Sequence, residues 1–318
     1  MWKLTLAALS MLGLSQSALA GDKCDRACLE GFVDRYIAAM VAHDPAKVPW
    51  AARARFTENG QELRIGDALW GTASAPGRYK LYAADPDMGQ VGFYGTIFEN
   101  GTPVLLALRL KIENQVISEA ETIVARPTRG SPMGNAGETL EKKAPRPQFL
   151  RTVPMKERMS RNDLIRAADS YFTGLAANDG KNTAAFAASC LRWENGIQTN
   201  SNPTLMPTRP GSINFIAMGC EEQQKSGYFS FVTEIRNRRY PVVDVERGLV
   251  FSFAFFDHSG RVRDIHLTNG QTVPAGVTAP TAWEISELFE VDKGRLDQIE
   301  AVLNAVPYGM ISDAWDRK

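Results

Sequence analysis

Two short segments, RFTENG at residues 55–60 and RWENG at residues 192–196, are two copies of one sequence motif. A helix-like stretch that ends at Asp44 precedes the first copy, and one that ends at Asp179 precedes the second at nearly the same interval. A motif that recurs with its preceding helix indicates a repeated structural unit. The sequence therefore predicts one small fold used twice.

Two further landmarks recur in the same order in the two halves. Asp85-x3-Gly89-x-Val91 matches Asp244-x3-Gly248-x-Val250, and Ile117-Ser-Glu-Ala-Glu121 matches Leu296-Asp-Gln-Ile-Glu300. The offsets between the landmarks are 135, 136, 159 and 179 residues. Because the offset only grows along the chain, insertions in loops are enough to relate the two halves.

The first twenty residues have the features of an export signal. Lys3 is followed by an apolar core at residues 4–14 and by an Ala18-Leu-Ala20 cleavage site. We expect residues 1–20 to be removed and the protein to be exported, either to the periplasm or as a secreted protein. No later segment reaches the roughly 18 uninterrupted apolar residues of a spanning helix, so no membrane span is expected.

Charge disfavours nucleic acid as a partner. Without Lys3 the 36 basic side chains become 35, against 36 acidic ones. A nearly neutral chain offers no basic footprint for nucleic acid or for an anionic membrane. Its 44% apolar and 23% charged residues are typical of a globular protein.

Four cysteines in an exported chain favour disulfides. Cys190 and Cys220 flank the second Glu-Asn-Gly segment and are the favoured pair, whereas Cys24 and Cys28 lie four apart and would close a tight loop. Four cysteines allow three connectivities, which the sequence leaves open. A metal site is disfavoured because C-x3-C lacks a second close pair and the chain has three histidines.

Apolar spacing of three and four residues predicts amphipathic helices over residues 25–43 and 161–177. Strands are expected at 90–98, 103–112, 116–125, 228–235, 248–257, 285–291 and 296–303. Asn100-Gly101 and Ser259-Gly260 are turn signals that predict antiparallel hairpins. The proline-rich and charged residues 127–160 are expected to link domains at 21–126 and 161–318.

These elements predict an α+β fold. We expect two tandem cone-shaped α+β barrel domains, each a helix packed on a strongly curved antiparallel sheet. The two domains should pack as a pseudo-dimer within one chain, with a further homodimer left open.

Several phrases resemble a known family. FTENGQEL, GDALWGTA, ALRLKI with ISEAET, RWENG and IRNRRYPVVDVERG are similar to a two-domain group of exported, uncharacterised SnoaL-like proteins in the nuclear transport factor 2-like (cystatin-like) superfamily. The resemblance covers nearly all of residues 24–310. It implies a cone-shaped site and, for the superfamily's enzymes, acid–base chemistry without a cofactor. None of their catalytic patterns matches this chain as a motif, so no catalytic residue is carried over by position.

Glu119 and Glu121 are the first candidate catalytic pair. If their segment is a strand, Ile117, Glu119, Glu121 and Ile123 project from one face, which sets two carboxylates among isoleucines. Burial and mutual repulsion would then raise the pKa of one carboxyl and provide a base and a neutral acid. The alternative is a solvated face, or a pair neutralised by Arg109 or Arg126.

The Glu-Asn-Gly motif provides the second set of candidates. Glu58 and Glu194 could point into a cavity together with the preceding arginine, which is Arg55 in the first half, while Asn59 and Asn195 bind a substrate oxygen. The alternative is a tight hairpin turn in each half. Duplication favours that structural role, because both folds must survive while both active sites need not.

Aromatic side chains complete the predicted site. Tyr36 lies on the core-facing stripe of its helix and is a candidate hydrogen-bond donor to a substrate oxygen, although packing alone also explains a tyrosine there. Trp70 and Tyr94 are candidates for the apolar walls, and Arg109 for a polar contact with substrate.

The leading hypothesis is a lyase, dehydratase or isomerase that works without a cofactor or metal. Its substrate would be a small, mainly apolar or aromatic molecule of lignin- or polyketide-like character, bound in a cone-shaped pocket. The alternative is an exported ligand-binding or protein-interaction module without catalysis. The two hypotheses differ in what the interior contains: convergent ionisable groups favour an enzyme, and packed aromatic rings favour a binding module.

Overall fold

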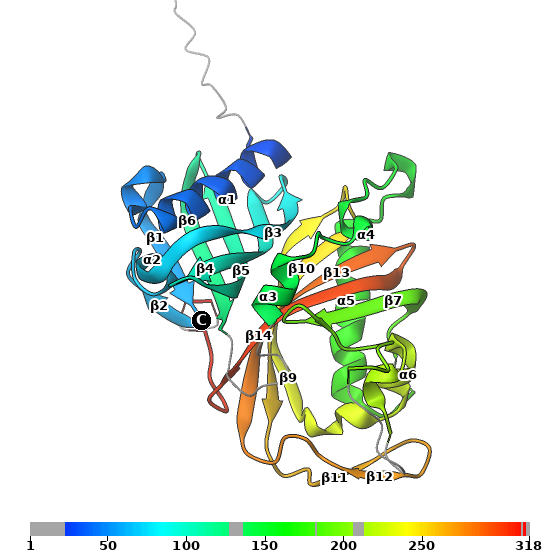
Figure 1. The fold of residues 1–318 in the computed structure, drawn as a ribbon. Helices are drawn as coiled ribbons and strands as arrows, with labels where there is room; N and C mark the ends of the chain where they lie inside the picture. The colour runs from blue at the N-terminus through cyan, green and yellow to red at the C-terminus, as the bar shows by residue number, and fades with distance from the viewer. Residues whose placement is uncertain (1–22, 127–135, 182, 206–212, 313, 316–318) are drawn as a thin grey trace, which may run out of the picture.

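The computed structural model describes residues 23–126, 136–181, 183–205, 213–312 and 314–315. Within these residues the strands form two six-stranded sheets, one in each half of the chain, and one two-stranded sheet (Figure 1). The predicted export signal at residues 1–20 lies outside the described residues.

The first unit starts with helix α1 (Arg26–Val41), which begins where the Asp25 carboxylate accepts the Cys28 N–H at 2.9 Å. Its apolar stripe, which includes Tyr36 and Phe32, packs on the sheet. The elements that follow are η1 (Pro45–Lys47), β1 (Trp50–Glu58), β2 (Gln61–Leu63), α2 (Leu69–Thr72), β3 (Ala73–Asp85), β4 (Gln90–Glu99), β5 (Thr102–Glu113) and β6 (Val116–Ala125).

The second unit follows a connecting segment that contains α3 (Ala136–Glu141), α4 (Pro147–Leu150) and η2 (Met155–Glu157). Its helix α5 (Arg161–Ala177) is capped by Ser160, which accepts the Asp163 N–H. The later elements are β7 (Phe186–Glu194), β8 (Ile197–Gln198), η3 (Phe215–Ala217), α6 (Cys220–Lys225), η4 (Tyr228–Phe231), β9 (Glu234–Asp244), β10 (Leu249–His258), β11 (Asp264–His266), β12 (Thr272–Pro274), β13 (Thr281–Asp292) and β14 (Arg295–Val306).

The two large sheets have the same strand order, which agrees with the predicted duplication. The first runs β2-β1-β6-β5-β4-β3 and the second β8-β7-β14-β13-β10-β9. The register agrees as well: Glu121 lies opposite Thr57 beside Glu58, and Glu300 lies opposite Trp193 beside Glu194. The expected equivalences of Glu58 with Glu194 and of Glu121 with Glu300 therefore hold.

The predicted fold class, two tandem cone-shaped α+β barrels of a helix on a curved antiparallel sheet, is wrong. Most of the ordered elements are strands, and both sheets are mixed, because β1 pairs in parallel with β6 and β7 with β14. Apolar alternation marks a strand but not the direction of its neighbour, so the sequence could not reveal this pairing. In the first unit the space under α1 is a packed core.

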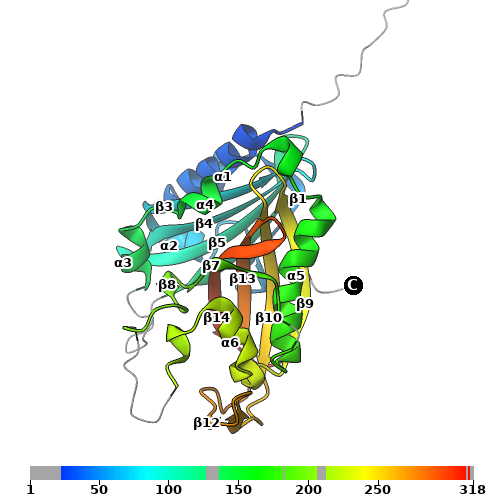
Figure 2. The same ribbon diagram turned by 90° about the vertical axis from the view of Figure 1, so that its right-hand side faces the viewer.

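The two sheets pack against each other through the faces that α1 and α5 leave uncovered (Figures 1 and 2). We call the side of each sheet under its helix the helix face, and the side towards the other unit the interface. Side chains from both sheets form one apolar cluster in the interface, among them Tyr94, Leu105, Ile123, Phe251, Phe253 and Leu288. The two units thus form the pseudo-dimer expected within one chain.

Reciprocal polar contacts join the units. The Asp85 carboxylate accepts the Val243 N–H at 2.9 Å and pairs with Arg161 at 2.5 Å. Its counterpart Asp244 accepts the Ala84 N–H at 3.0 Å and pairs with Arg26 at 2.7 Å. Both arginines stand at the first position of a helix, α1 or α5. The recurring Asp-x3-Gly-x-Val landmark is therefore a symmetric clamp between the units.

Both cysteine pairs are disulfides, Cys24–Cys28 and Cys190–Cys220. The favoured Cys190–Cys220 pairing is confirmed, and the bond ties α6 to strand β7. Across the described ranges, no helix combines the length and apolar character needed to cross a bilayer.

Three local expectations differ from the structure. Residues 228–231 form the turn η4 rather than part of a strand, and β3, a long strand at the sheet edge, was not expected. Ser259-Gly260 does not join two strands directly, because the excursion that holds β11 and β12 follows it. Asn100-Gly101 does connect β4 to β5 as predicted.

Candidate functional site

The first predicted pair, Glu119 and Glu121, lies in the interface. A register shift beside Lys111 reverses the strand alternation, so Ile117 joins the helix-face core while both glutamates face the second unit. Glu121 is 3% exposed and pairs with Arg109 at 2.9 Å. The alternative in which arginine neutralises the carboxylates is the one observed.

Arginine charge also controls the ionisation of Glu121. Burial disfavours the charged carboxylate, but the charges of Arg239 and Arg109 outweigh it and hold the pKa of Glu121 below its usual value. Glu119 accepts a hydrogen bond from Arg109 at 2.7 Å. Glu121 is therefore an ionised, paired side chain and not the neutral acid that its position beside Glu119 predicted.

Tyr36, Trp70 and Glu58 lie on the opposite, helix face of the first sheet. The Trp70 indole N–H donates to the Tyr36 hydroxyl at 2.9 Å, and both rings are fully buried. Glu58 accepts the Leu69 N–H at 3.0 Å and pairs with Arg126 at 2.9 Å, which fixes the start of α2. These residues fill the first unit, so Glu121 does not share a cavity with Tyr36 or Glu58.

The remaining first-unit candidates have structural contacts. The Arg55 guanidinium lies 4.9 Å from the Trp315 ring centroid, and the Tyr94 hydroxyl donates to Ser286 across the interface at 2.9 Å. Asn59 has a φ of 49° and its carboxamide oxygen accepts the Val124 N–H at 2.8 Å. The hairpin interpretation of Asn-Gly describes this turn.

Asn195 repeats the role of Asn59. Its φ is 45°, and its carboxamide accepts the Leu303 N–H at 2.9 Å and donates to the Leu303 carbonyl at 3.0 Å. In both units the asparagine side chain thus joins the turn to the strand that comes last in the sequence of that sheet, β6 or β14. Glu194 is the predicted site residue that the structure brings into a polar interior.

This polar interior is seen by comparing the residues that lie directly opposite one another on neighbouring strands, which form one row across each sheet. On the helix face of the first unit, the cross-strand row is Phe93, Leu108, Thr122 and Glu58. At the same positions the second unit has Ser252, Glu287, Ala301 and Glu194. A phenylalanine and a leucine are replaced by a serine and a glutamate, so the second unit has less apolar volume and a second carboxyl group.

Glu194 and Glu287 flank Ala301 on the same face. Two strand spacings separate their Cα atoms by about 10 Å, and the small Ala301 side chain lies between them. Glu287 is 1% exposed, and its Oε2 has no hydrogen-bond partner among the described residues. Glu194 keeps 19% of its side-chain surface exposed, so the row runs from a buried carboxyl to one that reaches solvent.

Burial raises the pKa of Glu287 well above its usual value, and the charge of Glu194 raises it further. The nearby Arg192 acts in the opposite direction but does not cancel these effects. The surroundings of Glu287 therefore favour the neutral, protonated form of its carboxyl group. This is the property expected of a general acid, found at a position that the sequence did not single out.

Arg192 lies beside the two carboxyls, where the first unit has Phe56. It is fully charged despite its burial, because Glu194 lies 3.4 Å away. Its guanidinium donates to the Thr199 hydroxyl at 3.1 Å and to the Tyr171 hydroxyl at 3.3 Å. Arg192 therefore does not correspond to Arg55, although both precede a Glu-Asn-Gly motif.

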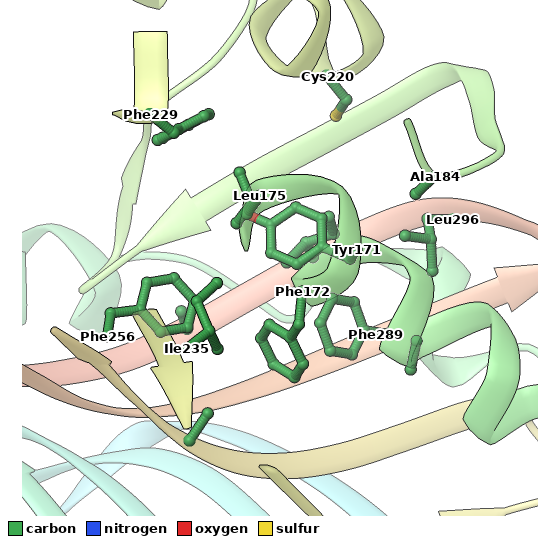
Figure 3. Close-up of a cluster of buried hydrophobic side chains, with 14 of the residues drawn as sticks. Tyr171, Phe172, Leu175, Ala184, Cys220, Phe229, Ile235, Phe256, Phe289 and Leu296 are labelled. Atoms are coloured by element: carbon green, nitrogen blue, oxygen red, sulfur yellow. The ribbon is translucent and has the colours of Figure 1, made fainter. Parts of the chain in front are cut away.

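Aromatic rings surround this polar group. Figure 3 shows Tyr171 and Phe172 directed from α5 towards Phe289 on β13. Phe229 lies 5.1 Å from the Arg192 guanidinium carbon. Further along the helix face, His258 stacks on Phe231, and burial lowers the pKa of His258 to about 4. The site thus combines two carboxyls and a guanidinium with apolar walls.

The sequence holds a signal for Glu287 that the motif comparison misses. Ile285, Glu287 and Phe289 alternate in one strand, so a glutamate lies on an apolar face. Extending the 179-residue offset back along the chain also matches Glu287 to Leu108. The acid becomes recognisable only when strand 285–291 is aligned with its counterpart at 103–112.

Comparison with known proteins adds little about function. Residues 157–303 match the model of a family described as a domain of unknown function, DUF8021. No curated protein sequence matches the chain at a significant level. Among solved structures, AusH from Aspergillus nidulans is similar over 50% of this chain and 92% of its own, with 14% identity and a TM-score of 0.27. Values this low support no statement about fold or activity.

Proposed function

We propose that the protein is an enzyme of lyase, dehydratase or isomerase type that works by acid–base chemistry without a cofactor, and that its site is the helix face of the second unit. The observation that carries the proposal is the replacement of Phe56, Phe93 and Leu108 by Arg192, Ser252 and Glu287 at equivalent positions. Ionisable groups in a core are costly, so the presence of Arg192 and Glu287 where the first unit has apolar side chains favours a chemical role.

The residues have complementary roles in this proposal. Glu194 would take a proton from a carbon next to a carbonyl or hydroxyl group, and Arg192 would stabilise the negative charge that develops on the oxygen. Glu287, whose raised pKa favours the protonated form, would return a proton to the product side of the molecule. Each turnover leaves the number of protons unchanged, because Glu194 passes its proton to water while Glu287 is reprotonated.

The substrate we infer is small and mainly apolar or aromatic, because rings such as Tyr171, Phe229 and Phe289 surround the polar group. The SnoaL-like resemblance supports the same class, since enzymes of that superfamily use ionisable groups in an apolar interior. Export is also inferred, from residues 1–20 and from the two disulfides.

Hydrogen exchange tests the proposal on simple model compounds. Small aromatic ketones and aldehydes are incubated with the protein in D2O, and loss of the α-proton signal is followed by NMR. For any compound that the wild type exchanges, Glu194→Gln and Glu287→Gln should each lower the rate by roughly a hundredfold. Glu58→Gln is the matched control, because Glu58 is the counterpart of Glu194 in the packed unit.

The same experiment distinguishes the binding-module alternative. Unchanged exchange in Glu194→Gln, measured on a confirmed substrate, would show that the catalytic assignment is wrong. Compounds that raise the melting temperature of the wild type, with no α-proton exchange in any of them, would favour a site that binds without catalysis.

A further inference from the structure

A second polar cluster lies in the interface and is independent of the proposed active site. Each sheet has a glutamate at the same position facing the other unit, Glu121 in the first and Glu300 in the second. Each glutamate has an arginine beside it and an indole ring near that arginine. The two clusters contain the same kinds of groups, so a difference in their hydrogen bonds is informative.

In the first cluster Arg109 has several acceptors. The Arg109 guanidinium donates to Glu121 at 2.9 Å, to Glu119 at 2.7 Å and to the Gln90 carboxamide oxygen at 2.9 Å. Its Cζ lies 4.7 Å from the centroid of the Trp315 ring. The arginine therefore has two carboxylates, an amide oxygen and an aromatic face as partners.

In the second cluster Leu288 stands opposite Glu300, where Arg109 stands opposite Glu121, and the nearby cations come from the connecting segment and lack acceptors. Arg146 donates through Nη2 to the Ile299 carbonyl at 3.1 Å and lies 3.6 Å from Glu300. Its Nε and Nη1 are buried without a hydrogen-bond partner in the described part of the chain, and so is Nε1 of Trp193. The Lys143 ammonium lies 3.7 Å from the Trp193 ring centroid. Buried donors without acceptors are costly unless a ligand or water completes them.

The second cluster also lacks a counterpart of Glu119. Glu119 stands two positions before Glu121, and at the same place before Glu300 the second unit has Gln298. Gln298 is neutral, and its Oε1 has no partner among the described residues. Asp297 is nearby, but its carboxylate accepts from Ser189 and from Gln298. The second cluster thus lacks the carboxylate that completes the first.

The two cations also act on each other. Burial lowers the pKa of Lys143, and the charge of Arg146 lowers it further. Burial likewise lowers the pKa of Arg146, while Glu300 opposes the change. Lys143 is exposed and Trp193 half-buried, so an anion from solution can reach this place. An anion held there would relieve the repulsion and satisfy the open donors.

We propose that Lys143, Arg146 and Trp193 form a binding site for the carboxylate group of a small organic acid, which supplies the acceptor that the buried donors of Arg146 and Trp193 lack. The site lies on the interface side of the second sheet, whereas Glu194 and Glu287 lie on its helix face. A failure of this proposal would therefore leave the proposed acid–base site untouched, and the reverse also holds.

The test uses sodium acetate as the probe and the Trp193 indole N–H as the reporter. Acetate is titrated into ¹⁵N-labelled protein at constant ionic strength kept with sodium chloride, and the indole resonance is assigned with Trp193→Phe. We expect a saturable shift of that resonance. Arg146→Gln and Lys143→Gln should weaken acetate binding on the order of tenfold each, as expected for a lost charge-assisted contact. Lys142→Gln, at the exposed neighbouring position, is the matched control and should bind like the wild type.

A variant that adds a negative charge provides a second test if Arg146→Gln does not fold. Gln298→Glu would supply the missing carboxylate from the protein itself, so it should abolish the acetate response while the melting temperature stays at or above that of the wild type. A wild-type acetate response in Gln298→Glu would overturn the proposal. A linear, unsaturated shift would also overturn it, as would inorganic phosphate that binds more tightly than acetate.

Discussion

Glu287 shows how one residue changes the character of a core. The first unit has Leu108 at the same place, within a continuous apolar cluster. A glutamate there must either stay protonated or bury a charge, and the nearby Glu194 favours the protonated form. The sheet provides the same backbone geometry in both units, so the side chain alone decides whether the interior is inert or ionisable.

Stability should depend on pH through Glu287. Its pKa is raised on folding, so the native state keeps a proton that the unfolded chain loses above the usual glutamate pKa of 4.5. The contribution of Glu287 to stability is therefore highest below that value and falls as pH rises towards the raised native pKa. Glu287→Gln, which mimics the protonated form, should remove this fall, so its advantage over the wild type grows with pH by at most about 1.4 kcal/mol per unit.

Urea denaturation at several pH values from 4 to 9 would measure this difference. Glu138→Gln is the control, because Glu138 is exposed on α3 and far from the row. A constant difference between Glu287→Gln and the wild type over this range would mean that Glu287 ionises normally in the folded protein.

Glu58 and Glu194 should differ in what their loss costs, although they are equivalent in position. Glu58 accepts the Leu69 N–H and pairs with Arg126, so Glu58→Ala removes a helix-start contact and a partly buried ion pair. We expect a loss of about 1–3 kcal/mol in the free energy of unfolding. Glu194 has 19% of its side-chain surface exposed, and Glu194→Ala should cost less. Thermal unfolding of the two variants side by side would decide, and equal losses would contradict the different roles.

At the level of elements, the segment between the second strand of each unit and its long edge strand differs most. In the first unit α2 follows β2 and its Trp70 fills the interior. In the second unit η3, α6 and η4 lie in that interval, and the Cys190–Cys220 disulfide fastens them to β7. Trp70 of α2 thus fills the helix face of the first sheet. In the second unit we call η3, α6 and η4 the cover, and the disulfide holds this cover against β7.

Removing this disulfide should loosen the cover more than the sheet. The bond closes a loop with a sequence separation of 30 residues, which restricts the unfolded chain by roughly 3–4 kcal/mol. Cys190→Ala/Cys220→Ala should lower the free energy of unfolding by about that amount. Amide exchange should speed up mainly in α6 and η4. Equal acceleration in β13 and β14 would indicate that the bond supports the sheet itself.

At the scale of the whole molecule, the two units depend on each other through matching contacts. Arg26 of the first unit pairs with Asp244 of the second, and Arg161 of the second unit pairs with Asp85 of the first. Each aspartate also accepts a backbone N–H from the unit that provides its arginine. The apolar interface cluster spans both sheets. A half of the chain produced alone would expose this face to water, so folding of the units is expected to be coupled.

Loss of either arginine should therefore cost a similar amount. Arg26→Met leaves the fully buried Asp244 without its closest cation, and Arg161→Met does the same to Asp85. Each should lower the free energy of unfolding by about 3 kcal/mol, the scale for a broken buried pair. The control Arg64→Met removes an exposed pair with Asp67 and should change stability by less than about 0.5 kcal/mol. Urea titration that finds Arg26→Met no worse than Arg64→Met would contradict the clamp.

The duplication, the two long helices and strands β4, β5, β6, β10, β13 and β14 were predictable without the structure. Repeated motifs and apolar periodicity are local properties, so Glu-Asn-Gly, the 25–43 and 161–177 helices and the strand pairs around Asn100-Gly101 were predictable. The pairing of Cys190 with Cys220 was favoured because the cysteines flank one motif in an exported chain.

Strand direction and the surroundings of each charge depend on how the sheets assemble. The parallel pairing of β1 with β6 joins segments far apart in the chain, and no local pattern encodes it. The register of β5 with β6 shifts by one residue beside Lys111, so Glu119 and Glu121 lie in the interface and on the opposite face from Ile117. There the charge of the neighbouring arginines lowers the pKa of Glu121. Glu287 faces Glu194 across Ala301 because β14 lies between their strands. A pKa depends on such neighbours in space, and these are fixed only when the sheets have assembled.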